Sequence, residues 1–141
     1  MNNYDINTRI PNPHDCLIRR IHIENGCLVF TFEDNISCHE SIQAIHPGAE
    51  SLTMRFHLIL EPGIDMYELY ARKPRFIHDA FTLQKKESLF SLTEGKYSLE
   101  YLNHYAGDGE IIVHLGSAEY DYMLSVHADS VAFDWIEPEA Q

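Results

Sequence analysis

The fold is decided near the carboxyl end of the chain by residues 97–135, which read YSLEYLNHYAGDGEIIVHLGSAEYDYMLSVHADSVAFDW. Apolar and polar side chains alternate along this stretch, and an alternation of period two is typical of half-buried β-strands. Turn residues interrupt the alternation at positions 107–109, 116–119 and 129–130. The pattern therefore predicts a four-stranded antiparallel meander over residues 97–136.

The turns set the pairing of these predicted strands. A three-residue loop at Gly107-Asp108-Gly109 places Tyr105 opposite Ile111, because its last glycine suits a left-handed backbone conformation. A tight turn at 129–130 then separates the third strand from the fourth. These registers gather apolar side chains on an inner face, which consists of Tyr97, Leu99, Tyr101, Ile111, Val113, Leu115, Tyr120, Tyr122, Leu124, Val126, Val131, Phe133 and Trp135.

The opposite face of the meander carries a largely apolar row with polar flanks. The row consists of His104, Ile112, Met123 and Ile136, with Glu100, His114 and Asp121 on one side and Glu110, Ser125 and Asp134 on the other. An apolar stripe with a charged border is typical of a protein-binding surface. The predicted surface comprises Glu100, His104, Glu110, Ile112, His114, Asp121, Met123, Asp134 and Ile136. The alternative is that a helix or a second sheet of the same chain covers this face, since domains are built in layers.

The amino-terminal part of the chain contains a predicted hairpin over residues 14–34. Two apolar runs are joined there by Asn25-Gly26, the preferred pair for a two-residue type I′ turn. Ile18 lies an odd number of residues from Ile21, which predicts a β-bulge at Arg19-Arg20. Residues 1–13 are polar and rich in turn residues, and we expect a flexible arm there.

The middle of the chain completes the predicted architecture. Ser37-Cys38-His39-Glu40 has the form of a helix capping box and predicts one short helix that ends near Ile45. Alternation predicts strands at residues 51–61, 66–73 and 75–83. The fold class that we predict for the single domain of residues 1–141 is all-β and mainly antiparallel. It has about eight strands in a sandwich or partly open barrel, with one short helix.

Charge is distributed unevenly along the chain, whose formal net charge is −12. Residues 97–141 hold nine acidic residues and no Lys or Arg, whereas the other 13 acidic residues stand against all 10 Lys and Arg. A negative field repels nucleic acids and anionic membranes and accelerates encounter with basic proteins. We therefore expect a basic protein partner, no nucleic acid and no membrane. The alternative is that the excess acid serves solubility alone.

The cysteine content indicates the compartment. Cys16, Cys27 and Cys38 lack C-x-x-C spacing, and no apolar signal segment follows Met1. This is typical of a reduced, cytoplasmic protein, which is the localisation we expect. No stretch of the sequence reaches the length of a membrane span.

Catalytic motifs are scarce. His104, His114 and His127 share a predicted strand face and are the candidate metal ligands, but they lack the close spacing that zinc sites usually show. Neither a G-x-S-x-G elbow nor a glycine-rich phosphate loop is present. We therefore expect no enzymatic activity and no cofactor, with a metal-dependent enzyme as the third reading of the sequence.

Aromatic residues suggest a second reading. The chain has eight tyrosines and one tryptophan, and inward-facing rings can line a ligand cavity when a sheet closes into a barrel. Large rings more often fill a core. The alternative function is thus a small-molecule-binding β-barrel whose cavity would be lined by Tyr101, Tyr122 and Trp135.

Two hairpins carry a family resemblance. The opening one contains His14-Asp15-Cys16, then Ile18, Ile21 and Ile23, then Asn25-Gly26-Cys27-Leu28-Val29-Phe30; the closing one is Tyr122-x-Leu124-x-Val126-x-Ala128-Asp129-x-Val131-x-Phe133. The chain resembles small bacterial β-rich domains of unknown function, some of which are immunity proteins of polymorphic toxin systems. The resemblance implies an intracellular protein that neutralises a partner by binding it, without catalysis. A symmetric homodimer through the apolar row is the other expected assembly.

Overall fold

The fold is mostly antiparallel β with one short helix, as predicted. The computed structural model describes residues 2–60, 64–69, 75–77, 99–117 and 121–139. Within these residues one sheet has nine strands: β1 (Asn2–Asp5), β2 (Leu17–Glu24), β3 (Cys27–Phe32), β4 (Ser51–Leu58), β5 (Ile64–Leu69), β6 (Arg75–Ile77), β7 (Leu99–Gly107), β8 (Glu110–Gly116) and β9 (Asp121–Ile136). A 3-10 turn, η1 (Ile36–Cys38), and the helix α1 (Glu40–Ile45) lie between β3 and β4.

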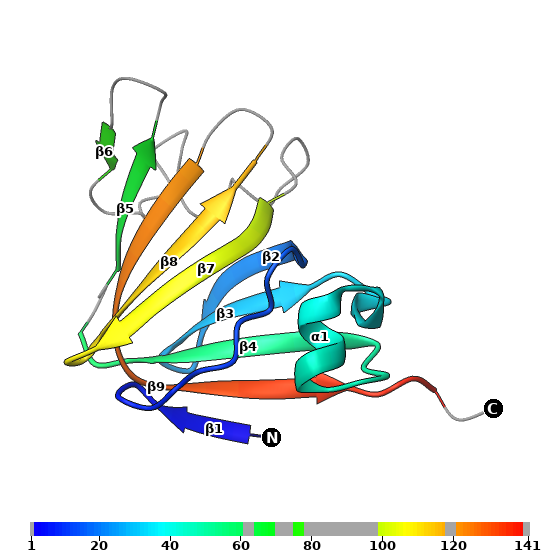
Figure 1. Cartoon of the computed structure of the whole chain (residues 1–141). Coiled ribbons are helices and arrows are strands. Elements are labelled where there is room, and N and C mark those ends of the chain that lie inside the picture. Colours follow the sequence, from blue (N-terminus) through cyan, green and yellow to red (C-terminus); the bar gives the residue numbers. More distant parts are fainter. Residues whose placement is uncertain (1, 61–63, 70–74, 78–98, 118–120, 140–141) are drawn as a thin grey trace.

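Six of the strands close into a ring in the order β4, β3, β2, β7, β8, β9, with β9 returning to β4. β5 and β6 extend the sheet from β9, and β1 also pairs with β9. Figure 1 shows that β9 runs from the upper group of strands, in orange, into the lower group, in red. β9 is therefore the strand that both halves of the sheet share.

The first half of β9 pairs with β8 and β5, and the second half pairs with β4 and β1. The turn predicted at residues 129–130 is wrong, because β9 continues through these positions. The described part of residues 97–136 therefore has three strands where four were predicted. The register with β4 instead shifts between His57 and Leu58. Ala128 and Val131 are both buried although they are three positions apart, an odd number. A bulge produces this change of phase as well as a turn does.

The hairpin of β2 and β3 agrees with its prediction. Asn25 and Gly26 both have positive φ values, 50° and 73°, as a type I′ turn requires. The register shifts between Ile18 and Arg20, so the bulge predicted at Arg19-Arg20 is confirmed. It returns Ile18 to the buried face.

The hairpin of β7 and β8 differs from its prediction near the loop. Asp108 and Gly109 have φ values of 53° and 76° and form a two-residue loop that places Tyr105 opposite Ile112. The predicted pairing of Tyr105 with Ile111 is therefore wrong. A register shift between Tyr101 and Asn103 leaves Leu102 as a bulge.

On the far side of Leu102 from the loop, the observed pairing of β7 with β8 agrees with the predicted pairing, and the inner face is largely as predicted. Tyr101 lies opposite Leu115, the pairing that a three-residue loop without a bulge also gives. The fully buried members are Leu99, Tyr101, Ile111, Val113, Leu115, Leu124, Val126, Val131 and Phe133, and Tyr122 is almost fully buried. Tyr97 and Tyr120 lie outside the described residues.

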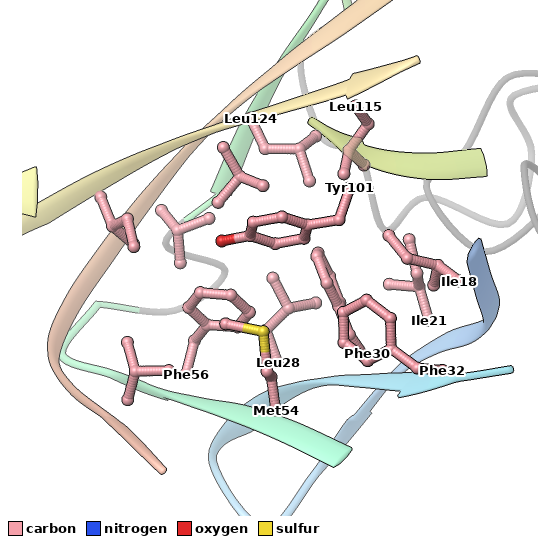
Figure 2. Packing of buried hydrophobic residues seen from close by; sticks show 14 of the residues in the cluster. Ile18, Ile21, Leu28, Phe30, Phe32, Met54, Phe56, Tyr101, Leu115 and Leu124 are labelled. Atoms are coloured by element: carbon pink, nitrogen blue, oxygen red, sulfur yellow. The ribbon is translucent and has the colours of Figure 1, made fainter. Parts of the chain in front are cut away.

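The core fills the ring around the side chain of Tyr101. Figure 2 shows the aromatic ring of Tyr101 reaching between Leu115 and Leu124 on one side and Leu28, Phe30 and Phe56 on the other. Its centroid lies 6.3 Å from that of Phe30 in an edge-to-face contact, an arrangement that aromatic pairs prefer. Aromatic side chains thus fill the interior of the ring.

The segment predicted to be a flexible arm contains the strand β1. β1 pairs with β9 from Asn2 opposite Phe133 to Asp5 opposite Ser130. Ile6 and Ile10 are buried in the core. The polar sequence of residues 1–13 did not indicate a strand, because β1 is stabilised by a partner strand from the opposite end of the chain.

The predicted helix exists but begins later than the capping box indicated. α1 is preceded by His39, which makes no side-chain capping bond, while Ser37 lies within η1. The predicted strands at 51–61, 66–73 and 75–83 correspond to β4, β5 and β6 in the described ranges. Within those ranges no helix has the length and apolarity of a membrane span.

Candidate protein-binding surface

The candidate site is the outward side of β5, β7, β8 and the first half of β9, which we call the outer face. The observed registers form two rows across these four strands. One row consists of Tyr105, Ile112, Ser125 and Asp65, and the next consists of Asn103, His114, Met123 and Tyr67. Both rows come from strands that the antiparallel ladder holds in fixed register.

Apolar side chains form the middle of the outer face. Tyr105 is 65% exposed and Tyr67 is 42% exposed. Ile112 and Met123 lie half-buried on the two strands between them. Tyrosine is enriched at protein interfaces because its ring is apolar and its hydroxyl tolerates water. This part of the outer face is therefore suited to contact another protein.

Acidic side chains border the apolar part. The Nε2 atom of His114 lies 3.1 Å from Oδ2 of Asp121. At the other end, the Ser125 hydroxyl donates a hydrogen bond of 2.7 Å to Oε1 of Glu110. Glu100 lies across Gly116 from Asp121 in the ladder. The sequences of the four strands contain no Lys or Arg, so the border is negative throughout.

The bulge residue Leu102 adds to the apolar part through its position beside Gly116. A Cβ atom at position 116 would lie 2.8 Å from Cδ1 of Leu102, closer than two carbon atoms can pack without a shift. The absence of a side chain at Gly116 therefore lets Leu102 lie against β8. No pattern in the sequence indicates this contact.

The structure assembles only part of the surface predicted from the sequence. Glu100, Glu110, Ile112, His114, Asp121 and Met123 lie on the outer face. Asp134 and Ile136 are on the second half of β9, opposite Thr53 and Ser51 of β4. They are separated from the other residues because β9 continues where a turn was predicted.

His104 was also predicted on this surface, and it lies on the inner side instead. It is opposite Val113, and its Nδ1 atom is 2.8 Å from the hydroxyl of Tyr101. Burial lowers its pKa from the ordinary value, while a hydrogen bond to the Ile10 carbonyl opposes this. The Leu102 bulge causes the inversion, since it exchanges the faces of the residues between it and the loop. Tyr105 and Asn103 take the outward positions.

The candidate metal ligands are not brought together. His104 bonds to Tyr101 inside, His114 pairs with Asp121, and His127 lies opposite Glu110 on the outward side. Within the described residues there is no group of three His, Cys, Asp or Glu that could hold a metal ion. We therefore derive no metal chemistry from these histidines.

The three aromatic residues predicted to line a cavity occupy different environments. Tyr101 and Tyr122 are buried, and burial raises the pKa of Tyr101 far beyond its usual range. Trp135 stacks on the ring of His46, with 4.8 Å between centroids and 9° between planes. His46 also pairs with Glu137 at 2.6 Å. Trp135 therefore joins α1 to the carboxyl-terminal segment and does not share a lining with the two tyrosines.

Another cluster has the residue types of a nucleophilic site. Cys27 lies opposite His57, whose Nδ1 atom is 2.7 Å from Oδ1 of Asp129. That bond lowers the pKa of Asp129. Burial, however, raises the pKa of Cys27, so the thiol is less ionised than usual, the opposite of what nucleophilic catalysis requires. This cluster therefore does not support an enzymatic function.

No protein family, curated protein or solved structure matches the chain. The outer face is consequently the main basis for a functional conclusion.

Proposed function

We propose that this protein is a non-catalytic, immunity-like protein that binds a basic protein partner through its outer face. The observation that carries the proposal is the combination of an apolar centre, with Tyr105 the most exposed part, and an acidic border on strands without Lys or Arg. Apolar contact supplies affinity, and a border of one charge sign selects a partner of the opposite sign and accelerates its encounter.

A second copy of the same chain is a poor occupant of this face. A symmetric dimer brings the same patch of both subunits together around a two-fold axis. Glu110 and Asp121 of one copy would then approach the acidic border of the other, and like charges at an interface cost several kcal/mol. The proposed partner is accordingly a different protein with exposed Lys or Arg.

Two further features bear on the proposed immunity-like role and on a location in the cytoplasm. Of the two hairpins in which the resemblance to immunity-like domains was noted, that of β2 and β3 forms with the predicted turn and bulge, whereas residues 122–133 lie within the single strand β9. The proposed compartment is the reducing cytoplasm, where the free thiols of Cys16, Cys27 and Cys38 would stay reduced. A toxin neutralised there, such as a nuclease, would have the basic surface that the outer face complements.

The first partner to test is the product of the gene that adjoins this one. Its binding to the purified protein would be measured by calorimetry and surface plasmon resonance. Ile112→Glu places a charge in the centre of the outer face and should weaken binding at least 30-fold, about 2 kcal/mol for a central interface position. Ile136→Glu is the matched control, because Ile136 is an exposed isoleucine of β9 outside the outer face.

Charge reversal tests the acidic border separately. Glu110→Lys with Asp121→Lys should slow association and weaken its dependence on salt, while dissociation changes less. Glu137→Lys with Glu139→Lys is the control for the change in total charge. Equal effects of the two double variants, or loss of binding in Ile136→Glu alone, would place the interface elsewhere and contradict the proposal.

A further inference from the structure

The ring has a weak closure between β2 and β7. Their register contains two residue pairs, Leu17 with Glu100 and Ile18 with Leu99. Beyond these pairs, residues 6–13 take the place of a strand beside β7, and we call them the seam segment. In Figure 1 this segment leads from β1 to β2 across the front of the lower strands.

Side chains connect the seam segment to β7 and to the loop that follows it. Asp108 donates its backbone N–H to Oδ1 of Asn7 at 3.0 Å. Asn12 donates from Nδ2 to Oδ1 of Asn103 at 3.0 Å. Two prolines of the segment, at positions 11 and 13, have no N–H to donate to a ladder. The seam therefore has fewer backbone hydrogen bonds than the other joints of the ring, and local opening begins most easily at such places.

His104 is the contact between the seam segment and the core. Its Nε2 atom lies 3.1 Å from the Ile10 carbonyl, which can only accept, so Nε2 carries the proton. Nδ1 therefore accepts from the hydroxyl of Tyr101, 2.8 Å away. The bond to Tyr101 requires the neutral ring, because a protonated Nδ1 cannot accept, whereas the bond from Nε2 to the Ile10 carbonyl is kept in either state. A proton on Nδ1 would deprive the fully buried Tyr101 hydroxyl of its acceptor and would place a charge in the interior.

The surroundings of His104 do not stabilise such a charge. Val113 faces it from β8, and Tyr101 remains neutral on β7. Arg9 of the seam segment is exposed and of the same sign as a protonated imidazole. Within the described part of the chain, burial and the bond to Ile10 are the causes that act on the His104 ring, with no contribution from a carboxylate. Water is the remaining means of solvating the charge.

We propose that the seam segment is an acid-sensitive closure of the ring: protonation of His104 favours a state in which residues 6–13 leave β7 and water enters the seam. The seam segment separates from β7 more easily than paired strands separate from each other, because side-chain hydrogen bonds hold much of it in place. The proposal is independent of the partner-binding function, since it concerns the isolated protein.

Hydrogen exchange of the full-length protein, followed by mass spectrometry at pH 7.5 and pH 5.5, tests this closure. Exchange times are scaled for the intrinsic effect of pH on amide exchange. Protection over residues 6–13 should fall about tenfold, since opening linked to one proton changes by up to tenfold per pH unit. Protection over β4, at the opposite side of the ring, should stay unchanged and exclude global unfolding.

Two variants identify the histidine responsible. His104→Gln keeps a neutral side chain that can donate and accept, and it should abolish the pH effect on residues 6–13. His57→Gln removes an exposed histidine elsewhere and should leave the effect intact. If His104→Gln does not fold, Tyr101→Phe, which removes the donor to the neutral ring, should lower the protection of residues 6–13 at pH 7.5 and reduce its further loss at pH 5.5. Equal protection at both pH values, or a pH effect that survives in His104→Gln, would overturn the proposal.

Discussion

Replacement of Tyr101 by phenylalanine is expected to destabilise the protein although the core keeps its shape. The hydroxyl of Tyr101 is the hydrogen-bond donor to Nδ1 of the half-buried His104 ring. Phenylalanine fills nearly the same volume, so no cavity cost arises. It leaves Nδ1 without this donor, and an unsatisfied buried acceptor costs about 1–3 kcal/mol. Loss of the hydroxyl from an apolar site offsets part of this, and we expect a net cost of about 1.5 kcal/mol.

Urea denaturation followed by circular dichroism at pH 8 measures this cost directly. The midpoint should fall with an unchanged slope, and the melting temperature should fall by roughly 5 °C, because a domain of this size loses roughly 3 °C per kcal/mol. Tyr105→Phe is the control: its hydroxyl is on an exposed ring, so the change should stay within about 0.5 kcal/mol.

A double-mutant cycle assigns the cost to the Tyr101–His104 bond. In a His104→Phe background the acceptor is absent, so Tyr101→Phe should cost much less than in the original protein. A Tyr101→Phe variant as stable as the original protein would refute the reasoning. Full additivity in the cycle would refute it equally, since the hydroxyl would then act through some other contact.

Three further outcomes follow from the contacts described. Gly116→Ala should cost about 1 kcal/mol in urea denaturation, because its Cβ meets Leu102; the cost should fall by more than half in a Leu102→Ala background. Cys38 is exposed, whereas burial raises the pKa of Cys16 to about 12. A thiol-reactive disulfide should therefore label Cys38 rapidly and Cys16 only after unfolding, and early labelling of Cys16 would contradict its burial. Burial holds the pKa of His104 below 6.5, so the unfolded chain takes up this proton first. The stability that His104 contributes should be full above about pH 7 and should decline as the pH falls through 6.5, by at most about 1.4 kcal/mol per pH unit; parallel stability curves for the original protein and His104→Gln would count against it.

The opening hairpin could be predicted from the sequence because its signals are local. Asn25-Gly26 favours one turn type, and that turn alone sets the register of β2 with β3. Ile18 and Ile21 are an odd number of residues apart, and within one strand a bulge is the device that places both side chains on the same face. Since no distant partner was needed for either inference, the structure agrees with both.

β1 and β9 could not be predicted as they are because distant partners decide them. Nothing in the polar residues Asn2–Asp5 favours a strand, and β1 exists because it pairs with β9. Likewise, a turn and a bulge explain the phase change near Asp129 equally well from sequence. The pairing of β4 along the second half of β9 decides for the bulge, and the residues of β4 lie between 70 positions (Leu58 and Ala128) and 85 positions (Ser51 and Ile136) before their partners.

The outer face shows which part of a surface prediction survives such errors. Membership of a face depends only on whether the count of residues between two positions is odd or even, whereas adjacency depends on the full register. Ile112, His114 and Met123 therefore remained outward on β8 and β9, although Ile112 pairs with Ser125 and not with Met123, its neighbour in the predicted row. The loop at Asp108-Gly109 is one residue shorter than predicted, and the bulge at Leu102 restores the register. His104 lies between the two, so the face predicted for it was wrong, whereas the face predicted for Tyr101, beyond the bulge, was right. The binding hypothesis consequently depends on β8 and β9, and substitutions at Ile112 test it more directly than any change at His104.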